Sequence, residues 1–183
     1  MRNPGALLAF RVMLAPSLGG AYGVPSSFLL TVLLALAPGQ DEAVPETCSV
    51  TLSTDTSFVP PFPYTPLAPI ANRFWYGTDE LWAMPASDGV WRGVESPEGV
   101  YNKVFCWSTR WDWRTDHQPD LSVTVQALDG SVSPVTMHGA TNAHNKDDIK
   151  HAMLVAVGLP TRGCWQITGE CKEQSLSYVV WVP

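Results

Sequence analysis

Runs of alternating apolar and polar residues recur through the second half of the chain. The run 100–107 (VYNKVFCW) alternates well, and so does the run 121–127 (LSVTVQA), which closes on Asp129-Gly130, a strong turn signal. The run 131–139 is weaker, because Pro134 has no backbone N–H to donate and belongs on an edge strand. A period of two residues predicts β-strands in all three segments.

The end of the chain predicts a β-hairpin. The segment 164–171 (CWQITGEC) and the segment 176–182 (LSYVVWV) are both rich in β-branched and aromatic residues. Between them lies a short polar connection. Two runs of this kind around a polar turn are typical of two paired antiparallel strands.

The remaining apolar runs are short and end at turn signals. The segments 73–77 (RFWYG), 80–85 (ELWAMP) and 87–93 (SDGVWRG) close on glycine or proline. The segment 148–160 predicts a strand, or one helical turn leading into a strand, and its valines favour the second interpretation. About seven to nine short strands without a clear helix predict an all-β, antiparallel β-sandwich.

A proline-rich stretch, residues 40–72, precedes this domain. Its centre, FVPPFPYTPLAP, holds five prolines and predicts an extended arm rather than a core strand. Two roles are open for the arm: a lid over its own sheet, or a segment that docks into an aromatic groove of a partner. The first is favoured.

The first 39 residues resemble an export signal. They contain Arg2 and Arg11 but no acidic residue, and residues 28–37 (FLLTVLLALA) form an unbroken apolar run. That length is typical of a signal peptide and short for a membrane span. We expect cleavage before Gln40, with an uncleaved anchor from about Leu7 to Ala37 as the alternative. The sandwich would then occupy residues 73–183 of a secreted, periplasmic or cell-envelope protein.

Charge excludes one class of partner. Of the 11 basic residues, Arg2 and Arg11 would leave with the signal, so 9 would remain against 17 acidic ones, a formal net charge of −8. A chain this acidic has no broad basic field to attract phosphate backbones, so nucleic acid is excluded as a partner. Membrane contact is expected only through an uncleaved N-terminal segment.

Four cysteines predict two disulfides in an oxidising compartment. Seven strand steps put Cys164 and Cys171 roughly 23 Å apart on opposite faces, so they cannot bond each other in a regular strand. Two pairings remain: Cys48–Cys164 with Cys106–Cys171, or Cys48–Cys171 with Cys106–Cys164. We favour the first, because Cys106 lies mid-strand and Cys48 lies on an arm that gains from being tied at one end.

Three motifs, FWYGTDELW, DGVWRG and LPTRGCWQITGE…LSYVVWV, resemble small, uncharacterised exported bacterial proteins. The resemblance spans roughly Phe74 to Val182. Their closing hairpin is similar to the last two strands of an immunoglobulin-like sandwich. The resemblance therefore implies an immunoglobulin-like fold, and it brings no catalytic residues with it.

Eight tryptophans exceed what a sandwich core needs. Three of them share strand parity within one stretch and alternate with charged residues, which together form the candidate ligand-binding set: Trp107, Arg110, Trp111, Asp112, Trp113 and Arg114. Flat aromatics beside planar hydrogen-bonding groups suit sugar rings, and Trp and Arg also dominate protein hot spots. The competing interpretation is that the tryptophans pack beneath a loop, with the arginines stacked over them.

No motif points to a cofactor or a metal. The segment 140–151 contains His144, Asp147, Asp148 and His151, but it lacks a paired-histidine or calcium-loop spacing, so a solvated loop is favoured. A nucleophile elbow is absent. We therefore expect a non-catalytic binding module with a carbohydrate or envelope-protein partner; the alternative is a glycan hydrolase that uses scattered carboxylates.

Overall fold

The computed structural model describes residues 43–64, 68–143 and 151–183. The signal peptide or anchor expected in residues 1–39 lies outside these ranges and stays a prediction. Within the described ranges, no helix is long and apolar enough to cross a membrane. The strands and the arm belong to one compact unit, Gly39–Pro183.

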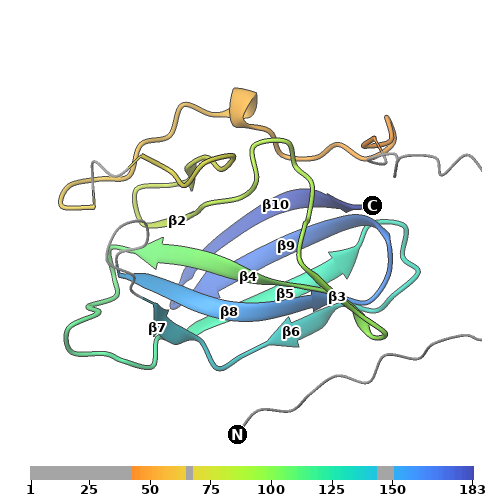
Figure 1. Cartoon of the computed structure of the whole chain (residues 1–183). Coiled ribbons are helices and arrows are strands. Elements are labelled where there is room, and N and C mark those ends of the chain that lie inside the picture. The colour runs from red at the N-terminus through yellow and green to blue at the C-terminus, as the bar shows by residue number, and fades with distance from the viewer. Residues whose placement is uncertain (1–42, 65–67, 144–150) are drawn as a thin grey trace, which may run out of the picture. The chain divides into compact units, whose positions relative to one another are not determined.

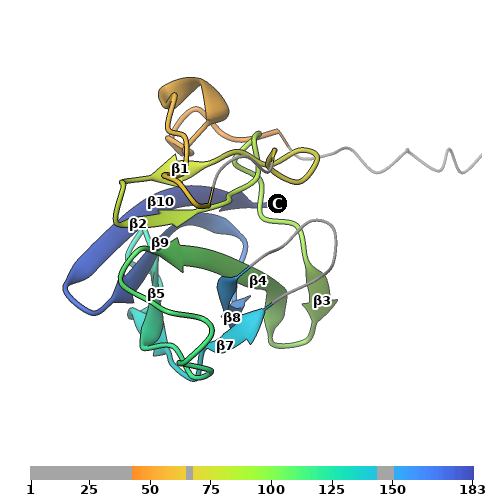
Figure 2. The ribbon, with the colours of Figure 1, turned by 90° about the vertical axis from the view of Figure 1, so that its left-hand side faces the viewer.

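Two antiparallel sheets pack as a β-sandwich, which confirms the all-β class (Figure 1). The six-stranded sheet has the order β1-β2-β4-β8-β7, with β3 beside β4; the four-stranded sheet has the order β10-β9-β5-β6. The first contains β1 (Tyr76–Gly77), β2 (Leu81–Ala83), β3 (Val94–Ser96), β4 (Gly99–Ser108), β7 (Thr141–Ala143) and β8 (Ala152–Leu159). The second contains β5 (Leu121–Ala127), β6 (Val135–Met137), β9 (Gly163–Cys171) and β10 (Gln174–Val182). Figure 2 shows β5 and β9 on one side and β4 and β8 on the other.

The described residues contain ten strands, where the sequence predicted about seven to nine. The difference comes from segments of two or three residues. For example, β3 pairs only with the start of β4, and β7 only with the start of β8. Such short segments are too polar and too brief to show a period of two. The helical turn expected before β8 falls largely outside the described ranges.

The core between the sheets follows the alternation seen in the sequence. On β5 the residues Leu121, Val123 and Val125 are at most 2 % exposed, and those between them are only partly buried. On β9, Trp165 and Ile167 are fully buried. Burial of this kind stabilises the sandwich by roughly 1.5–3 kcal/mol for each large apolar side chain.

The closing hairpin is confirmed. β9 and β10 pair along their whole length, from Cys171 opposite Gln174 to Gly163 opposite Val182. The connection is the two-residue turn at Lys172 and Glu173, and Lys172 adopts the left-handed conformation with φ of 55°. The turn therefore places the last residue of β9 opposite the first residue of β10.

The proline-rich arm covers the outer face of the six-stranded sheet, as the favoured interpretation predicted. A second apolar cluster lies there, formed by Trp82, Met84, Trp107 and Ala152, with Phe58, Tyr64 and Ile70 of the arm packed against it. The Tyr64 ring meets Trp82 edge to face, with 5.0 Å between ring centroids. The only helix in the described ranges is a single 3-10 turn of this arm, η1 (Ser53–Asp55). The arm is thus a lid over its own sheet.

The disulfide Cys48–Cys164 is present, with 5.6 Å between the Cα atoms. Cys164 faces outward from β9, whereas Cys171 is buried in the core, as seven strand steps require. Beyond the disulfide the arm follows β10. The Thr51 N–H donates to the Val179 carbonyl at 3.0 Å, and the Val179 N–H donates to Thr51 Oγ1 at 2.9 Å.

The second predicted disulfide, Cys106–Cys171, is not formed, and that prediction is wrong: both cysteines are buried free thiols. Cys106 faces Gly169, where an added Cβ would lie 3.3 Å from its sulfur. The Cys171 sulfur lies 3.7 Å from the sulfur of Met153 instead. Cys106 therefore faces β9 at Gly169, two residues before Cys171, and the two sulfurs do not bond.

This arrangement predicts the chemical reactivity of the thiols. Burial raises the pKa of Cys106 to about 12 and also raises the pKa of Cys171. Thiolate is the reactive form, so we expect iodoacetamide to label neither cysteine in the folded protein at neutral pH. After unfolding without reductant, mass spectrometry should show two labels per chain, one on each free cysteine. An unfolded, unreduced chain that takes up no label would contradict the structure.

Candidate functional site

The predicted site residues lie where β4 ends and the chain turns toward β5. Ser108, the last residue of β4, is buried, and its Oγ accepts the Arg110 N–H at 3.1 Å. Asp112 shapes the next turn: its Oδ1 accepts the Arg114 N–H at 3.0 Å, and its carbonyl accepts the Asp116 N–H at 2.9 Å. Short polar side chains that bond nearby backbone groups favour turns over a continued strand.

Trp107 and Trp111 are structural residues. Each is 3 % exposed. Trp107 packs edge to face on Trp75 in the cluster beneath the arm, whereas Trp111 lies in the core between the sheets. The expected shared face is therefore wrong: the strand ends at Ser108, and strand parity cannot continue to residue 111. These two tryptophans are packed side chains, and the cation–π contact of Arg114 falls on Trp113.

Trp113 differs from them, because its ring contacts two polar side chains. The imidazole of His151 stacks on the ring, with 3.6 Å between ring centroids and 12° between ring planes. The guanidinium of Arg114 lies over the ring at 4.5 Å from its centroid, a cation–π contact. The Trp113 carbonyl accepts a hydrogen bond from Asn142 Nδ2 at 3.1 Å. Packing thus holds a half-buried tryptophan in place at the surface.

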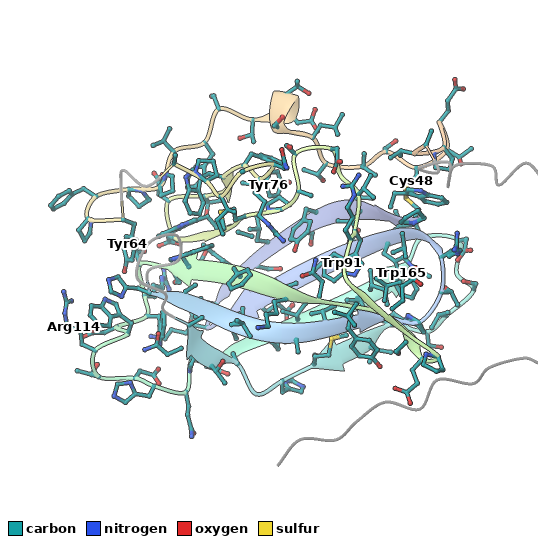
Figure 3. The ribbon with its side chains drawn as sticks, viewed as in Figure 1. Cys48, Tyr64, Tyr76, Trp91, Arg114 and Trp165 are labelled. Carbon is teal, nitrogen blue, oxygen red and sulfur yellow. A yellow bond between two sulfur atoms is a disulfide. The ribbon has the colours of Figure 1, made fainter. Side chains whose placement is uncertain are left out.

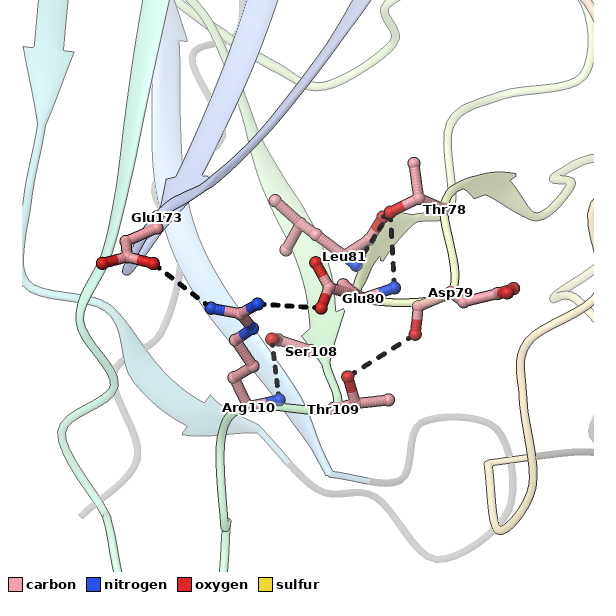
Figure 4. Close-up of polar contacts among 8 residues, drawn as sticks. All are labelled: Thr78, Asp79, Glu80, Leu81, Ser108, Thr109, Arg110 and Glu173. Atoms are coloured by element: carbon pink, nitrogen blue, oxygen red, sulfur yellow. Dashed lines mark hydrogen bonds and ion pairs between the residues drawn. The ribbon is translucent and has the colours of Figure 1, made fainter.

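Arg110 ties this loop to two other segments at the same end of the sandwich (Figure 4). Its guanidinium forms ion pairs with Glu80 at 2.9 Å and with Glu173 at 3.5 Å. The hydrogen bond and charge of Glu80, followed by those of Glu173, raise the pKa of Arg110. The Arg110 carbonyl accepts a hydrogen bond from Lys172 Nζ. The loop is therefore fastened to the β9–β10 turn.

These side chains line a cavity of about 390 Å³ at that end. Its lining comprises Pro63, Tyr64, Thr109, Arg110, Trp111, Asp112, Trp113, Arg114 and His151. Five of the six predicted residues are thus brought together, and Trp107 is not among them. In Figure 3, Tyr64 and Arg114 lie at one end of the sandwich, away from Cys48.

Four lining residues lie outside the predicted binding set: Pro63, Tyr64, Thr109 and His151. The Tyr64 hydroxyl donates to the Ser108 carbonyl at 3.4 Å, and burial, followed by the charge of Asp112, raises the pKa of Tyr64. The sequence did offer a signal for Tyr64, because it lies in an aromatic, proline-rich arm that was predicted to cover its own sheet. His151 had none, since its contact with Trp113 joins residues far apart in the chain.

The structure describes only part of the expected polar loop. His144, Asp147 and Asp148 lie outside the described ranges, and His151 stacks on Trp113. Among the described residues, no group of three or more His, Cys, Asp or Glu side chains is placed to hold a metal ion.

No family model, curated protein or solved structure matches the chain. The resemblance to small exported proteins stays a prediction that depends on the sequence motifs alone.

Proposed function

We propose that the protein is an exported, non-catalytic binding module with an immunoglobulin-like fold. Its binding surface would be the lining of the 390 Å³ cavity, called the end surface below. The stacked Trp113 is the observation that carries the proposal, since a preordered, partly accessible tryptophan on a loop is a typical binding feature.

Strand order supports the immunoglobulin-like class. That class has strands A, B, E and D in one sheet and C, F and G in the other, with C′ added beside C in some members. The order β2-β4-β8-β7 fits the first sheet, and β10-β9-β5-β6 fits the second. In addition, Val90 forms a parallel bridge with Trp181 of the last strand. In this scheme the end surface lies on the loop between B and C, and loops at the ends of such sandwiches are common binding sites.

Export is supported by the disulfide between Cys48 and Cys164, because disulfides persist in oxidising compartments. The apolar run 28–37 agrees with it, although it lies outside the described ranges. On these two features together we propose a secreted, periplasmic or cell-envelope location.

The contacts of the end surface favour a protein partner over a carbohydrate. A sugar ring stacks on an open aromatic face, but the Trp113 ring already stacks with His151 and carries the guanidinium of Arg114. Nearby on the arm, Phe62 is 87 % exposed. Exposed aromatics beside arginine are enriched in protein hot spots. We therefore propose a protein of the cell envelope as the partner.

Three acidic side chains of this end support a non-catalytic role. Glu80 and Glu173 bind Arg110, and Asp112 accepts hydrogen bonds within its own turn. A glycosidase needs two carboxyl groups that face one bond of the substrate, one of them free to donate a proton. The contacts of these three carboxylates hold the loop after β4 in place instead.

The test uses purified protein, an immobilised envelope fraction from producing cells, and a glycan array. We expect Trp113→Ala to weaken binding to the envelope fraction at least about thirtyfold, as hot-spot truncation does. The control is Tyr101→Ala, another exposed aromatic, on β4 but away from the end surface; it should change binding less than about threefold. Glycan binding lost in Trp113→Ala would replace the protein partner by a sugar, and turnover of a glycan would refute the non-catalytic role.

A further inference from the structure

The six-stranded sheet has an opening along one edge of β4. β2 pairs with Cys106–Ser108 and β3 pairs with Gly99–Tyr101, so Asn102–Phe105 have no described strand beside them on that edge. Here the chain between β2 and β3 leaves the sheet and reaches the other one, where the Trp91 N–H donates to the Trp181 carbonyl at 2.7 Å. Figure 1 shows this segment running from the level of β10 down to β3. The crossing segment leaves a window in the first sheet.

A cavity of about 570 Å³ fills this window. Its apolar lining includes Val104 of β4 and Tyr178 and Val180 of β10, all at most 6 % exposed, together with the buried Trp91, which Figure 3 labels. The volume lies in the range of small-molecule sites, which run from about 300 to 1,000 Å³. The opening is thus large enough for a compact organic ligand.

The side chain of Asn102 completes part of the missing ladder. Its amide Nδ2 donates to the Arg92 carbonyl, and its Oδ1 accepts the Lys103 N–H at 2.7 Å. An asparagine side chain therefore satisfies backbone groups that a strand would otherwise bind. The window can stay open without leaving those groups unpaired.

The charges around the cavity are mainly positive. Arg73, Arg92 and Lys103 line it, against a single acidic residue, Asp88. Asp88 is bound to Arg92 at 2.7 Å. Arg73 donates one hydrogen bond, to the Met84 carbonyl at 2.8 Å, and the described residues hold no ion pair of Arg73 or Lys103. Two cations are thus left to face an anion, in a chain whose formal net charge is −6.

We infer that the window is a second binding site, for a carboxylate joined to an apolar, ring-sized body. The carboxylate would bind Arg73 and Lys103, since charge-assisted hydrogen bonds are the strong ones. The apolar body would pack on Val104, Tyr178 and Trp91. Burial raises the pKa of Tyr178, so its hydroxyl stays protonated and can donate. This site shares no residue with the end surface and does not depend on the proposed function.

Such a ligand has two sources, a free organic acid or the C-terminal residue of a peptide. The probes are 3-phenylpropionate and the peptide N-acetyl-Ala-Ala-Phe, each with its carboxamide as the uncharged counterpart. Titration calorimetry on the full folded protein measures the dissociation constants. We expect both acids to bind at least about tenfold more tightly than their amides, because the amides lack the charge. Tighter binding of the peptide than of the free acid would assign the site to peptide C-termini, and the reverse to organic acids.

The variant that tests the assignment is Lys103→Met, since Lys103 is exposed and the change should not affect folding. It should weaken acid binding at least about tenfold and leave amide binding unchanged. Lys172→Met, an equal change of charge on the β9–β10 turn, should leave both unchanged. Arg73→Lys, which keeps the charge but not the fork of donors, should have an intermediate effect. Acids that bind no better than amides, or acid binding unaffected by Lys103→Met, would overturn the inference.

Discussion

Replacing Trp165 by alanine is expected to lower the free energy of unfolding by about 3–5 kcal/mol. Trp165 is fully buried between the two sheets, and its Nε1–H donates to the Thr161 carbonyl at 3.0 Å. The substitution removes a large apolar surface from the core and leaves a cavity. Urea unfolding followed by circular dichroism measures the change.

Trp113→Ala is the matched control for this substitution. Trp113 lies on a loop and is only partly buried, so its removal should cost less than half of what Trp165→Ala costs. The comparison separates a core tryptophan from a surface one. Equal losses for the two variants would contradict the assignment of Trp113 to the end surface.

Removing the disulfide with the double substitution Cys48→Ser and Cys164→Ser is the second large effect. The bond closes a sequence separation of 116 residues, for which loop entropy alone predicts a loss of about 4–5 kcal/mol. The arm would then be held mainly by Thr51 and by the contacts of Phe58 and Tyr64 with the outer cluster. Guanidinium unfolding, with the midpoint and slope both fitted, gives the change.

The control for the disulfide is the unsubstituted protein treated with reductant, which should lose the same stability within error. Limited proteolysis adds a second readout: cleavage within the arm should become faster in the double variant, while the sandwich stays intact at low denaturant. A loss below about 1 kcal/mol would show that the arm is held by packing rather than by the disulfide.

The strands were predictable where side chains alternate over seven or more residues. Those of β4, β5, β9 and β10 do so, and all four were found from the sequence. The distance between Cys164 and Cys171 along a strand excluded one pairing and left two open. The pairing of Cys48 with Cys164 was favoured because Cys48 lies on an arm that gains from being tied at one end, and it is confirmed. Short edge strands such as β3 and β7 carry no such signal.

The failures come from long-range register and from turn chemistry. Cys106 and Cys171 lie on facing sheets, and only the registry between sheets decides whether two sulfurs meet; no local pattern encodes it. The prediction of the candidate site assumed that the strand continued past Ser108. In the structure the strand ends there, and the Ser108 side chain accepts a hydrogen bond from the Arg110 N–H. The stacking of His151 on Trp113 depends on tertiary packing alone.

The central claim is that the end surface binds a protein partner, and site-directed photo-crosslinking tests it most directly. A photoreactive phenylalanine analogue replaces Thr115, which is exposed beside the end surface, in cells that make the full chain. The same analogue replaces Tyr101 as the control. The account predicts one crosslinked protein from position 115, absent when Trp113→Ala is added, and none from position 101. Crosslinking of equal yield from both positions, or a product from position 115 that persists with Trp113→Ala, would contradict it.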